Sequence, residues 1–206
     1  MDMKSHAQHG EDLHICRLID PSVPIYGVDV GANDGHSWSN SYMFGLEGYN
    51  LLLIEPMPIY AQRCRDLYVD YDKVLVEETA ISEVDGEATF YLNEDKEGDQ
   101  LAMRSSLYRD GVPSAVVSAI TVRTTPLYRL LAKHDWPRNY AFLTIDAEGC
   151  DFKVLNTARL NQFRPSVICV EEGEDHDEIE RYLKRFGYRQ DTVLGPNGIY
   201  VSDKNI

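Results

Sequence analysis

The sequence lacks two features that would tie it to a membrane or to secretion. Its longest apolar runs, such as "NLLLIEP" and "SVICVEE", are only a few residues long, whereas a helix that crosses a bilayer needs roughly 20. Its start, "MDMKSHAQHGEDLHICRLID", has no basic region, apolar middle or small-residue cleavage site. We therefore expect a cytoplasmic protein with no membrane partner.

Cysteines and basic residues are also scarce. Cys16, Cys64, Cys150 and Cys169 form no C-x-x-C pair and have no histidines at zinc spacing, which predicts reduced, mostly buried thiols. The 20 Lys and Arg residues are outnumbered by 34 Asp and Glu residues, giving a formal net charge of -14. This excess opposes binding to a phosphate backbone, so we exclude nucleic acid as the main partner.

The remaining pattern is that of one α/β domain over residues 1–206. A chain of 206 residues that is 43% hydrophobic can form one substantial core. Segments of strand length alternate with segments of helical period, which favours a sheet with helices on both faces. The expected strands are "IYGVDV", "NLLLIE", "KVLVEETAI", "AVVSAITVRTT", "YAFLTID" and "SVICVEE", and the expected helices are "EDLHICRLI", "SWSNSYMFGL", "PMPIYAQRCRDLY", "PLYRLLAKH", "DFKVLNTARL" and "DHDEIERYLKRF".

Two further segments resemble hairpins. The tail "YRQDTVLGPNGIYVSD" is typical of two strands joined through "GPNG", which gives the sheet an antiparallel edge. We interpret "SEVDGEATFYLNEDKEGDQ" as a hairpin that runs into a charged loop. Residues 101–115, "LAMRSSLYRDGVPSA", are a candidate mobile substrate loop, and a plain connector is equally compatible with them.

The stretch "YGVDVGANDGHSWSN" leads from a strand into a glycine turn. In a doubly wound sheet, ligands bind at the carboxyl ends of the strands where the strand order reverses. Gly31 and Gly35 would let the backbone turn tightly beside a ligand, although a purely structural turn is the alternative. A G-x-G-x-x-G dinucleotide fingerprint would need glycine in place of Asn33 and His36, and the sequence contains no G-x-x-x-x-G-K-[ST] phosphate loop.

An acid after the second strand suits a ribose. Glu55 in "LLLIEP" lies about 20 residues beyond the glycine turn, where a carboxylate can bind two ribose hydroxyls. A ribose site without a pyrophosphate site predicts an adenosine-type ligand, and S-adenosylmethionine is the foremost one. Asp29 would then bind its ammonium group, and the N–H groups of the turn would bind its carboxylate.

At several blocks the sequence resembles the FkbM family of S-adenosylmethionine-dependent methyltransferases. The most specific combination is D-V-G-A-N-x-G followed by I-D-x-E-G. The resemblance implies a Rossmann-like class I methyltransferase fold, with a doubly wound, mostly parallel seven-stranded sheet and an antiparallel C-terminal strand. The blocks are "SHAQHGEDL", "VDVGANDGHSWSN", "LLLIEPMP", "TAISEVDGEATFY", "FLTIDAEGCDFKVL" and "VICVEEGE".

The resemblance also implies site residues. The N-terminal helical segment, residues 1–22, would cover the cofactor site through Gln8, Glu11 and Asp12. The chain departs from the family where Leu127 and Tyr128 replace the usual Leu-Asp, and at Asp151, where glutamate is common. The implied cofactor contacts are Asp29, Gly31, Asn33 and Gly35 at the methionine end, Glu55 and Pro56 at the ribose, Ala80 and Ile81 near the adenine, and Asp146.

Two pairs of acids follow neighbouring strands. An alcohol that accepts a methyl group must lie in line with the donor and lose its proton. Asp146 with Glu148, or Glu171 with Glu172, could remove that proton, position the hydroxyl or hold a divalent metal, and oxygen ligands favour magnesium or calcium. We assign catalysis to Asp146 and Glu148 and assign no metal ligand, because Glu171 and Glu172 open an acidic run expected to be a solvated helix start.

Other candidates rest on residue type alone. His9 and His36 are candidate general bases because of their residue type. Trp38, Tyr42 and Tyr108 are candidates for ligand contact, although aromatic residues at such spacing more often belong to a core.

The leading hypothesis is an O-methyltransferase that uses S-adenosylmethionine and acts on a hydroxyl of a small molecule, such as a sugar or natural-product scaffold. The acceptor class follows from the resemblance. The alternative is a non-catalytic cofactor-binding or partner-binding module on the same fold, supported by the missing acid at Tyr128. A dehydrogenase is disfavoured by the missing glycines, and the sequence leaves a monomer and a homo-oligomer open.

Overall fold

The structure, a computed structural model, describes residues 4–93, 105–107 and 117–203. Of the candidate substrate loop at 101–115, only Ser105, Ser106 and Leu107 belong to the described residues, and Tyr108 lies outside them. The elements are α1 (Glu11–Leu18), β1 (Tyr26–Val30), α2 (Tyr42–Leu46), β2 (Asn50–Ile54), α3 (Pro58–Leu67), β3 (Val74–Glu77), β4 (Ala80–Ile81), β5 (Gly86–Asn93), β6 (Val117–Thr125), α4 (Leu127–Lys133), β7 (Asn139–Ile145), α5 (Asp151–Asn156), β8 (Arg164–Glu171), a 3-10 helix (Gly173–Asp175), α6 (His176–Arg185), β9 (Tyr188–Leu194) and β10 (Asn197–Ser202).

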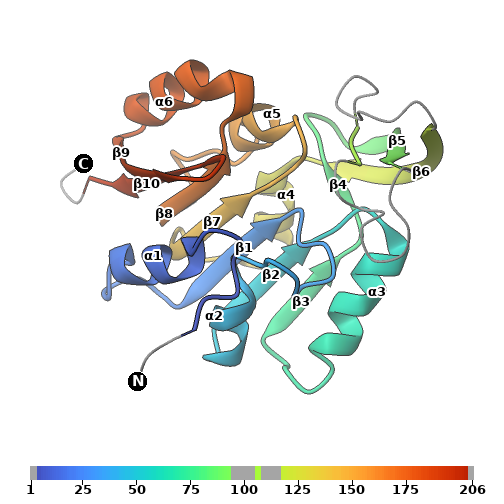
Figure 1. The fold of residues 1–206 in the computed structure, drawn as a ribbon, viewed down its shortest axis with the longest axis horizontal. Coiled ribbons are helices and arrows are strands. Elements are labelled where there is room, and N and C mark those ends of the chain that lie inside the picture. The colour runs from blue at the N-terminus through green and yellow to red at the C-terminus, as the bar shows by residue number, and fades with distance from the viewer. Residues whose placement is uncertain (1–3, 94–104, 108–116, 204–206) are drawn as a thin grey trace.

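Seven strands form the main sheet, in the order β3-β2-β1-β7-β8-β10-β9. The strands from β3 to β8 in this order are parallel to their neighbours, whereas β10 is antiparallel to both β8 and β9. The chain order reverses between β1 and β7, at the centre of the sheet (Figure 1). The structure therefore confirms the predicted doubly wound, mostly parallel sheet with an antiparallel C-terminal strand.

The central strands are buried on both faces, as their apolar sequences predict. In β2, Leu51 and Leu53 pack into one apolar cluster, whereas Leu52 and Ile54 pack into another. Successive side chains of a strand point to opposite faces, so a two-sided interior requires a continuous apolar run. All four side chains are at most 1% exposed.

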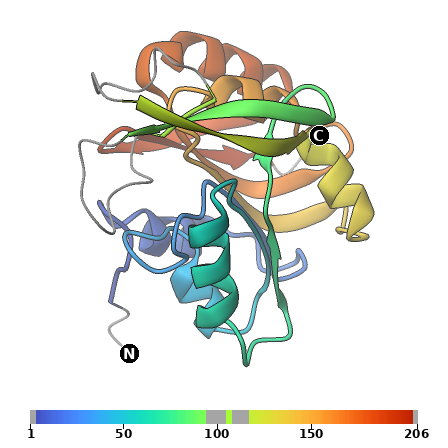
Figure 2. The same ribbon diagram turned by 90° about the vertical axis from the view of Figure 1, so that its right-hand side faces the viewer.

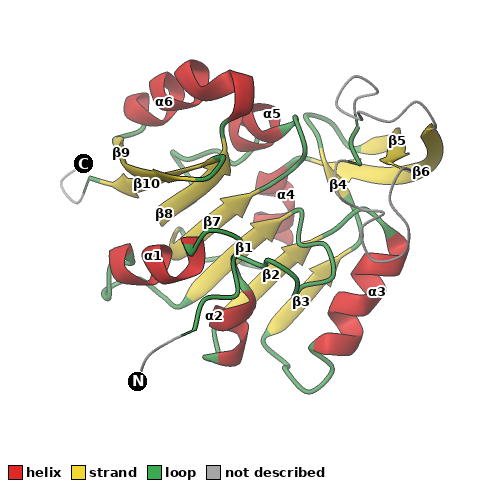
Figure 3. Cartoon of the chain, viewed as in Figure 1, coloured by secondary structure: helices red, strands yellow, loops and turns green. Residues whose placement is uncertain are grey.

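Helices cover both faces of this sheet (Figure 3). One face carries α1, α2 and α3, whose Ile15 and Cys64 are buried in the same apolar cluster. The other face carries α4, α5 and α6, which contribute Leu131, Leu155 and Ile179 to the second cluster. This arrangement leaves the carboxyl ends of the parallel strands uncovered by helices, which is where α/β folds bind ligands.

A second, three-stranded sheet of order β4-β6-β5 lies beside the main one. Figure 2 shows β5 and β6 crossing above α3. Met57 and Tyr60, at the start of α3, pack against Phe90 of β5 and Val122 of β6. The small sheet thereby extends the wall of the molecule beyond the carboxyl ends of β1 and β2.

Two sequence interpretations are wrong in this region. The predicted strand "KVLVEETAI" is divided into β3 and β4, which belong to different sheets. Thr79 lies at the break and donates a hydrogen bond of 3.0 Å to the carbonyl of Arg123 in β6. The predicted hairpin "SEVDGEATFYLNEDKEGDQ" is also wrong over its described residues, 82–93, where β5 is one strand that pairs with β6 from Gly86–Thr124 to Asn93–Val117. Residues 94–100 of this segment lie outside the described residues.

The four cysteines are free thiols, with Cys64, Cys150 and Cys169 buried and Cys16 partly exposed. Among the described residues, no helix has the length and apolar character needed to cross a membrane.

Candidate active site

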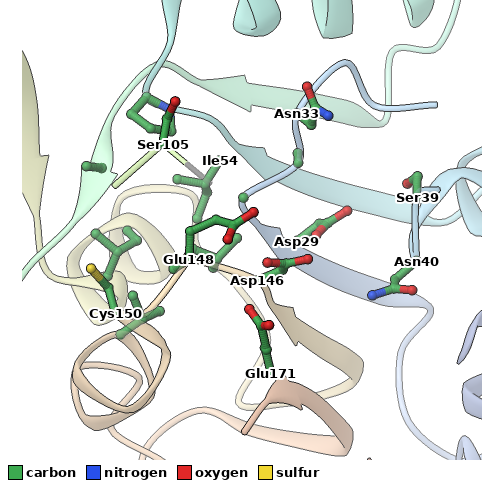
Figure 4. A pocket seen from close by; sticks show the side chains of 18 of the residues that line it. Asp29, Asn33, Ser39, Asn40, Ile54, Ser105, Asp146, Glu148, Cys150 and Glu171 are labelled. Atoms are coloured by element: carbon green, nitrogen blue, oxygen red, sulfur yellow. The ribbon is translucent and has the colours of Figure 1, made fainter. Parts of the chain in front are cut away.

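A cavity of about 420 Å³ lies at the carboxyl ends of β1, β2, β7 and β8 (Figure 4). Its volume is within the range of small-molecule sites. Gly35 and Glu55 are not among the described residues that line it. The predicted site residues that do line it are Asp29, Gly31, Asn33, Pro56, Ala80, Ile81, Asp146 and Glu148.

The glycine turn after β1 brings the backbone against the loop after β7. Gly31 has a φ of 86°, and a Cβ atom there would lie 1.8 Å from the carbonyl oxygen of Asp146. Its N–H donates a hydrogen bond of 2.9 Å to the carbonyl of Ile54. Only glycine satisfies both the left-handed backbone and this close approach. The geometry of the turn therefore requires glycine at position 31, independently of any contact with a ligand.

Asn33 is the turn residue with an unused polar atom. It has a φ of 50°, a conformation that asparagine tolerates better than most residues. Its Oδ1 is buried and has no hydrogen-bond partner among the described residues. Because Asn33 lines the cavity, this acceptor is available to a donor group of a ligand after a small side-chain adjustment.

Gly35 has a structural role outside the cavity. Its φ is 75°, and a Cβ atom would lie 3.1 Å from Sγ of Cys64 in α3. Its N–H donates a hydrogen bond of 2.9 Å to the carbonyl of Ala32. The predicted contact of Gly35 with a cofactor stays a prediction, and the structure explains the residue by the packing of the turn on α3.

Glu55, the predicted ribose acid, is buried behind the turn and is 4% exposed. One carboxylate oxygen accepts a hydrogen bond from the N–H of Asn33 at 3.0 Å, and the other accepts one from the N–H of Met57 at 2.8 Å. Burial raises the pKa of Glu55 to about 8. Each carboxylate oxygen has a second lone pair, so ribose binding stays a prediction, while support of the Asn33 backbone is an observed role.

Asp29 lies in β1 with its carboxylate at the cavity wall. Its oxygens accept hydrogen bonds from the hydroxyl groups of Thr144, at 2.7 Å, and Ser41. Burial raises the pKa of Asp29, and the two hydroxyl groups partly oppose that rise. Asp29 therefore joins β1 to β7 and to the start of α2, and any contact with an ammonium group would use its remaining lone pairs.

The loop after β7 holds both predicted catalytic acids. The N–H of Asp146 donates a hydrogen bond of 2.9 Å to the last carbonyl of β1. Glu148 has a φ of 49° and is followed by Gly149 at 83°. The carboxylate of Asp151 accepts hydrogen bonds from the N–H groups of Ala147, at 2.7 Å, and Gly149, at 3.1 Å. Asp151 therefore shapes the turn that presents Glu148 to the cavity.

Three carboxylates converge at this loop. One ligand oxygen from each of Asp146, Asp151 and Glu171 lies within 4.8 Å of the others. The Asp146 side chain is exposed at the cavity. Partial desolvation by the surrounding protein, together with the charges of Glu148 and Glu171, raises its pKa above the ordinary value. Burial raises the pKa of Asp151 to about 7. An oxygen-only set suits a hard cation, although its members differ from the acid pairs that the sequence suggested.

The expectation that Glu171 and Glu172 form a solvated helix start is wrong. Glu171 lines the cavity and points toward Asp146 (Figure 4). Glu172 is 6% exposed and accepts hydrogen bonds from the hydroxyl of Tyr200 and, at 3.0 Å, from Nε2 of Gln190. Its other oxygen lies 2.9 Å from Nδ1 of His176. The partners from β9 and β10 are far away in the sequence, so the acidic run alone did not indicate them.

The candidate histidines are not among the described residues that line the cavity. His36 packs against Tyr42, with 4.7 Å between the ring centres. His9 lies against Gly195, where a Cβ atom would be 2.2 Å from its ring. Neither is therefore supported as a general base. In contrast, Trp38 lines the cavity and is 52% exposed.

The N-terminal segment reaches the cavity through Gln8, which lines it. Glu11 and Asp12 are fully buried. Asn197 donates a hydrogen bond of 2.8 Å to Glu11, and Ser5 donates one of 2.6 Å to Asp12. These two acids fasten the segment, and the predicted cover over a cofactor stays a prediction.

The family model of the methyltransferase FkbM domain matches residues 29–190. The chain belongs to this FkbM family. Among solved structures, it is similar to methyltransferase FkbM from Methylobacillus flagellatus KT, with a TM-score of 0.55 and 18% identity over 86% of this chain and 43% of that one. It is also similar to precorrin-6y C5,15-methyltransferase from Geobacter metallireducens GS-15, with a TM-score of 0.48 and 11% identity over 98% and 91%. No curated protein matches.

This FkbM domain spans less than half the length of the Methylobacillus protein, and the likeness to that protein shows the fold alone. The departure at Tyr128 lies away from the cavity lining. Thr157 supports the start of α4. Its Oγ1 accepts a hydrogen bond of 3.1 Å from the N–H of Leu127, and its carbonyl oxygen accepts one of 3.2 Å from the N–H of Tyr128. Tyr128 thus lies in the first turn of α4, which Thr157 supports.

Proposed function

We propose that the protein is an S-adenosylmethionine-dependent O-methyltransferase that acts on a hydroxyl group of a small molecule, such as a sugar or natural-product scaffold. The observation that carries this proposal is the single cavity in which the glycine turn after β1 meets Asp146 and Glu148 after β7. Membership of the FkbM family supports methyl transfer as the reaction.

The residues at the glycine turn fit S-adenosylmethionine. Asn33 offers a buried acceptor for its ammonium group, with Asp29 behind it. Ala80 and Ile81, with Ile54, give the cavity an apolar part suited to an adenine ring. When bound, the cofactor supplies a methyl group on a positively charged sulfur, and the carboxylates of the cavity favour such a charge.

Asp146 and Glu148 are assigned to the acceptor hydroxyl. The raised pKa of Asp146 makes its carboxylate a stronger base than an ordinary aspartate. Glu148 comes from a turn fixed by Asp151, so its position is defined before the acceptor arrives. One acid takes the proton as the hydroxyl oxygen forms its bond to the methyl carbon and the bond from that carbon to sulfur breaks, which leaves a neutral thioether. The other acid orients the hydroxyl.

Calorimetric titration with S-adenosylhomocysteine tests the cofactor part of the proposal. We expect micromolar binding, about -8 kcal/mol, that weakens strongly in Glu55→Ala because the Asn33 turn loses its support. Glu83→Ala, which changes an exposed acid outside the cavity, should bind like the wild type. Absence of binding to the folded wild type would exclude the proposed function.

Asp146→Asn and Glu148→Gln separate the enzyme from a non-catalytic module on the same fold. An enzyme should lose turnover in both variants, and Glu148→Gln, which changes no predicted cofactor contact, should retain the affinity for S-adenosylhomocysteine. The module was supported by the missing acid at Tyr128, and Tyr128 is not among the described residues that line the cavity.

A further inference from the structure

The cavity has an end that the residues assigned to the cofactor do not occupy. Figure 4 shows Ser105 and Cys150 at one side, Ser39 and Asn40 at the other, and Asp146 with Glu148 between them. The apolar residues assigned to the adenine, Ala80 and Ile81, form β4 of the small sheet. Ser105 lines the cavity next to Ser106, which forms an isolated bridge with Tyr91 of β5. On the other side, Ser39 and Asn40 are assigned to no part of the cofactor, and Asp29 of the methionine end lies beside them. We therefore assign the Ser39 side, next to the methionine end, to the acceptor.

Trp38 is the large side chain at this end. The indole is 52% exposed, whereas the other tryptophan, Trp136, is 5% exposed in the core. Trp38 belongs to none of the apolar clusters found in the described part of the chain. An exposed tryptophan that lines a cavity is available for contact with a ligand and contributes little to folding.

The loop that carries Trp38 is held by hydrogen bonds on both sides of that residue. The sequence predicted a helix over this stretch, but α2 begins only at Tyr42. On one side, the Asp34 carboxylate accepts hydrogen bonds from the N–H and Oγ of Ser37, at 2.7 and 2.8 Å. On the other side, Ser39 Oγ accepts hydrogen bonds from the N–H groups of Ser41 and Tyr42, at 3.1 and 3.0 Å.

These bonds hold Trp38 at a φ of 53°. A left-handed backbone is unfavourable for a bulky residue and persists where the neighbouring structure imposes it. The exposure of Trp38 at the cavity is therefore a property of the folded loop.

The groups around this end are polar, and none of the cavity residues that the structure describes is Lys, Arg or His. Gln8, Asn40 and Asn197 contribute amides, which bind hydroxyl groups without a charge requirement. The carboxylates of the cavity repel an anion, and no described basic side chain offsets them. A phosphate or carboxylate on the acceptor would therefore be disfavoured.

We propose that Trp38 is the residue on which the acceptor's ring stacks, and that the acceptor is a hydroxylated ring without a negatively charged group. The inference rests on the proposed function, because the acceptor ring would receive its methyl group from a donor bound in the same cavity. It adds a specificity-determining residue and a charge requirement to that function.

Tryptophan fluorescence tests the stacking directly. Trp136→Phe leaves Trp38 as the single tryptophan. If Trp136→Phe does not fold, the difference in emission between the wild type and Trp38→Phe gives the Trp38 signal instead. The probes are methyl glucoside, glucuronate, glucose 6-phosphate and the open-chain polyol sorbitol. In protein saturated with S-adenosylhomocysteine, we expect methyl glucoside to change the Trp38 emission, and the two anions to bind at least about tenfold more weakly.

Sorbitol, which has no ring face, should leave the emission unchanged. Equal binding of the anionic and uncharged rings, or no response of Trp38 to any ring, would overturn the proposal. A full response to S-adenosylhomocysteine alone would also overturn it, because Trp38 would then belong to the cofactor site.

The kinetics of methyl transfer to the responding ring give the second readout. Trp38→Ala should raise the acceptor KM about tenfold, the scale of a lost aromatic stack, whereas Trp38→Phe should stay within about twofold of the wild type. Both variants should keep the wild-type affinity for S-adenosylhomocysteine, as should Tyr71→Ala, an exposed aromatic outside the cavity. A parallel loss of cofactor affinity contradicts the assignment of Trp38, whereas absent cofactor binding in the wild type contradicts the proposed function itself.

Discussion

Asn197 donates a hydrogen bond of 2.8 Å from Nδ2 to Oε1 of Glu11, and both residues are buried. The other carboxylate oxygen of Glu11 accepts from the N–H of His9 at 2.8 Å. One side chain therefore connects the N-terminal segment to the hairpin of β9 and β10, and the cavity residues Gln8 and Asn197 both depend on it.

Glu11→Ala should destabilise the protein. Removal of the carboxylate leaves the buried Asn197 amide and the His9 N–H without their hydrogen-bond acceptor. We therefore expect the free energy of unfolding to fall by about 3 kcal/mol. Urea denaturation measures it. Glu83→Ala, at an exposed loop position, should change stability by less than about 0.5 kcal/mol. Equal stabilities of the two variants would contradict the proposed role of Glu11.

Gly31→Ala and Gly48→Ala form a matched pair. Both glycines have a left-handed backbone, with φ values of 86° and 80°, but a Cβ atom at Gly48 would meet nothing within 4 Å. Gly48→Ala should therefore lose only the cost of the backbone conformation, about 1 kcal/mol. Gly31→Ala must also displace the carbonyl of Asp146, and we expect a total loss of about 3 kcal/mol or more.

Denaturation and S-adenosylhomocysteine titration check this pair. Gly48→Ala should bind like the wild type, whereas Gly31→Ala should bind weakly even at temperatures where it is folded. Similar losses in both variants would mean that the approach of the turn to Asp146 is not constrained.

Glu55 should make the protein less stable as the pH rises. Burial holds its folded-state pKa at about 8, above the ordinary 4.5. Between these values the folded state binds more protons than the unfolded state, so the free energy of unfolding falls with increasing pH, by up to about 1.4 kcal/mol per pH unit. Glu55→Gln should flatten this dependence between about pH 5 and 8. An unchanged slope, as expected for the control Glu83→Gln, would show that Glu55 ionises normally.

Glu171→Gln should shift the pH dependence of methyl transfer. Partial desolvation of Asp146 by the surrounding protein raises its pKa, and the neighbouring charges of Glu148 and Glu171 add to that rise. Removal of one negative charge lowers that pKa, so the acidic limb of the kcat profile should move to lower pH. Glu174→Gln, an exposed position on the following turn, should leave the limb in place. A limb that does not move in Glu171→Gln would exclude Asp146 as the titrating base.

The main sheet was predictable because its signal is local. The apolar run of β2 and the glycines after β1 specify a buried strand and a tight turn without reference to distant residues. The small sheet was not, since Ala80 and Ile81 pair with Thr124 and Thr125, and nothing in "KVLVEETAI" indicates that the strand divides.

The site was predictable to a similar extent. The position of Asp146 and Glu148 at the end of β7 follows from the order of strands, and the cavity contains both. The burial of Glu172 was missed because its partners, Gln190 and Tyr200, come from a later hairpin. The role of Asp151 was missed because it depends on the left-handed backbone of Glu148, which a motif does not report.

The lining of the cavity runs from Gln8 to Asn197. During synthesis, the ribosome releases the glycine turn and the acids after β7 well before the hairpin that carries Asn197. Glu11 therefore cannot accept the hydrogen bond from Asn197 until β10 has emerged and paired with β8. Until then, the cavity lacks the wall at Asn197 and the hydrogen bond that joins this wall to the N-terminal segment.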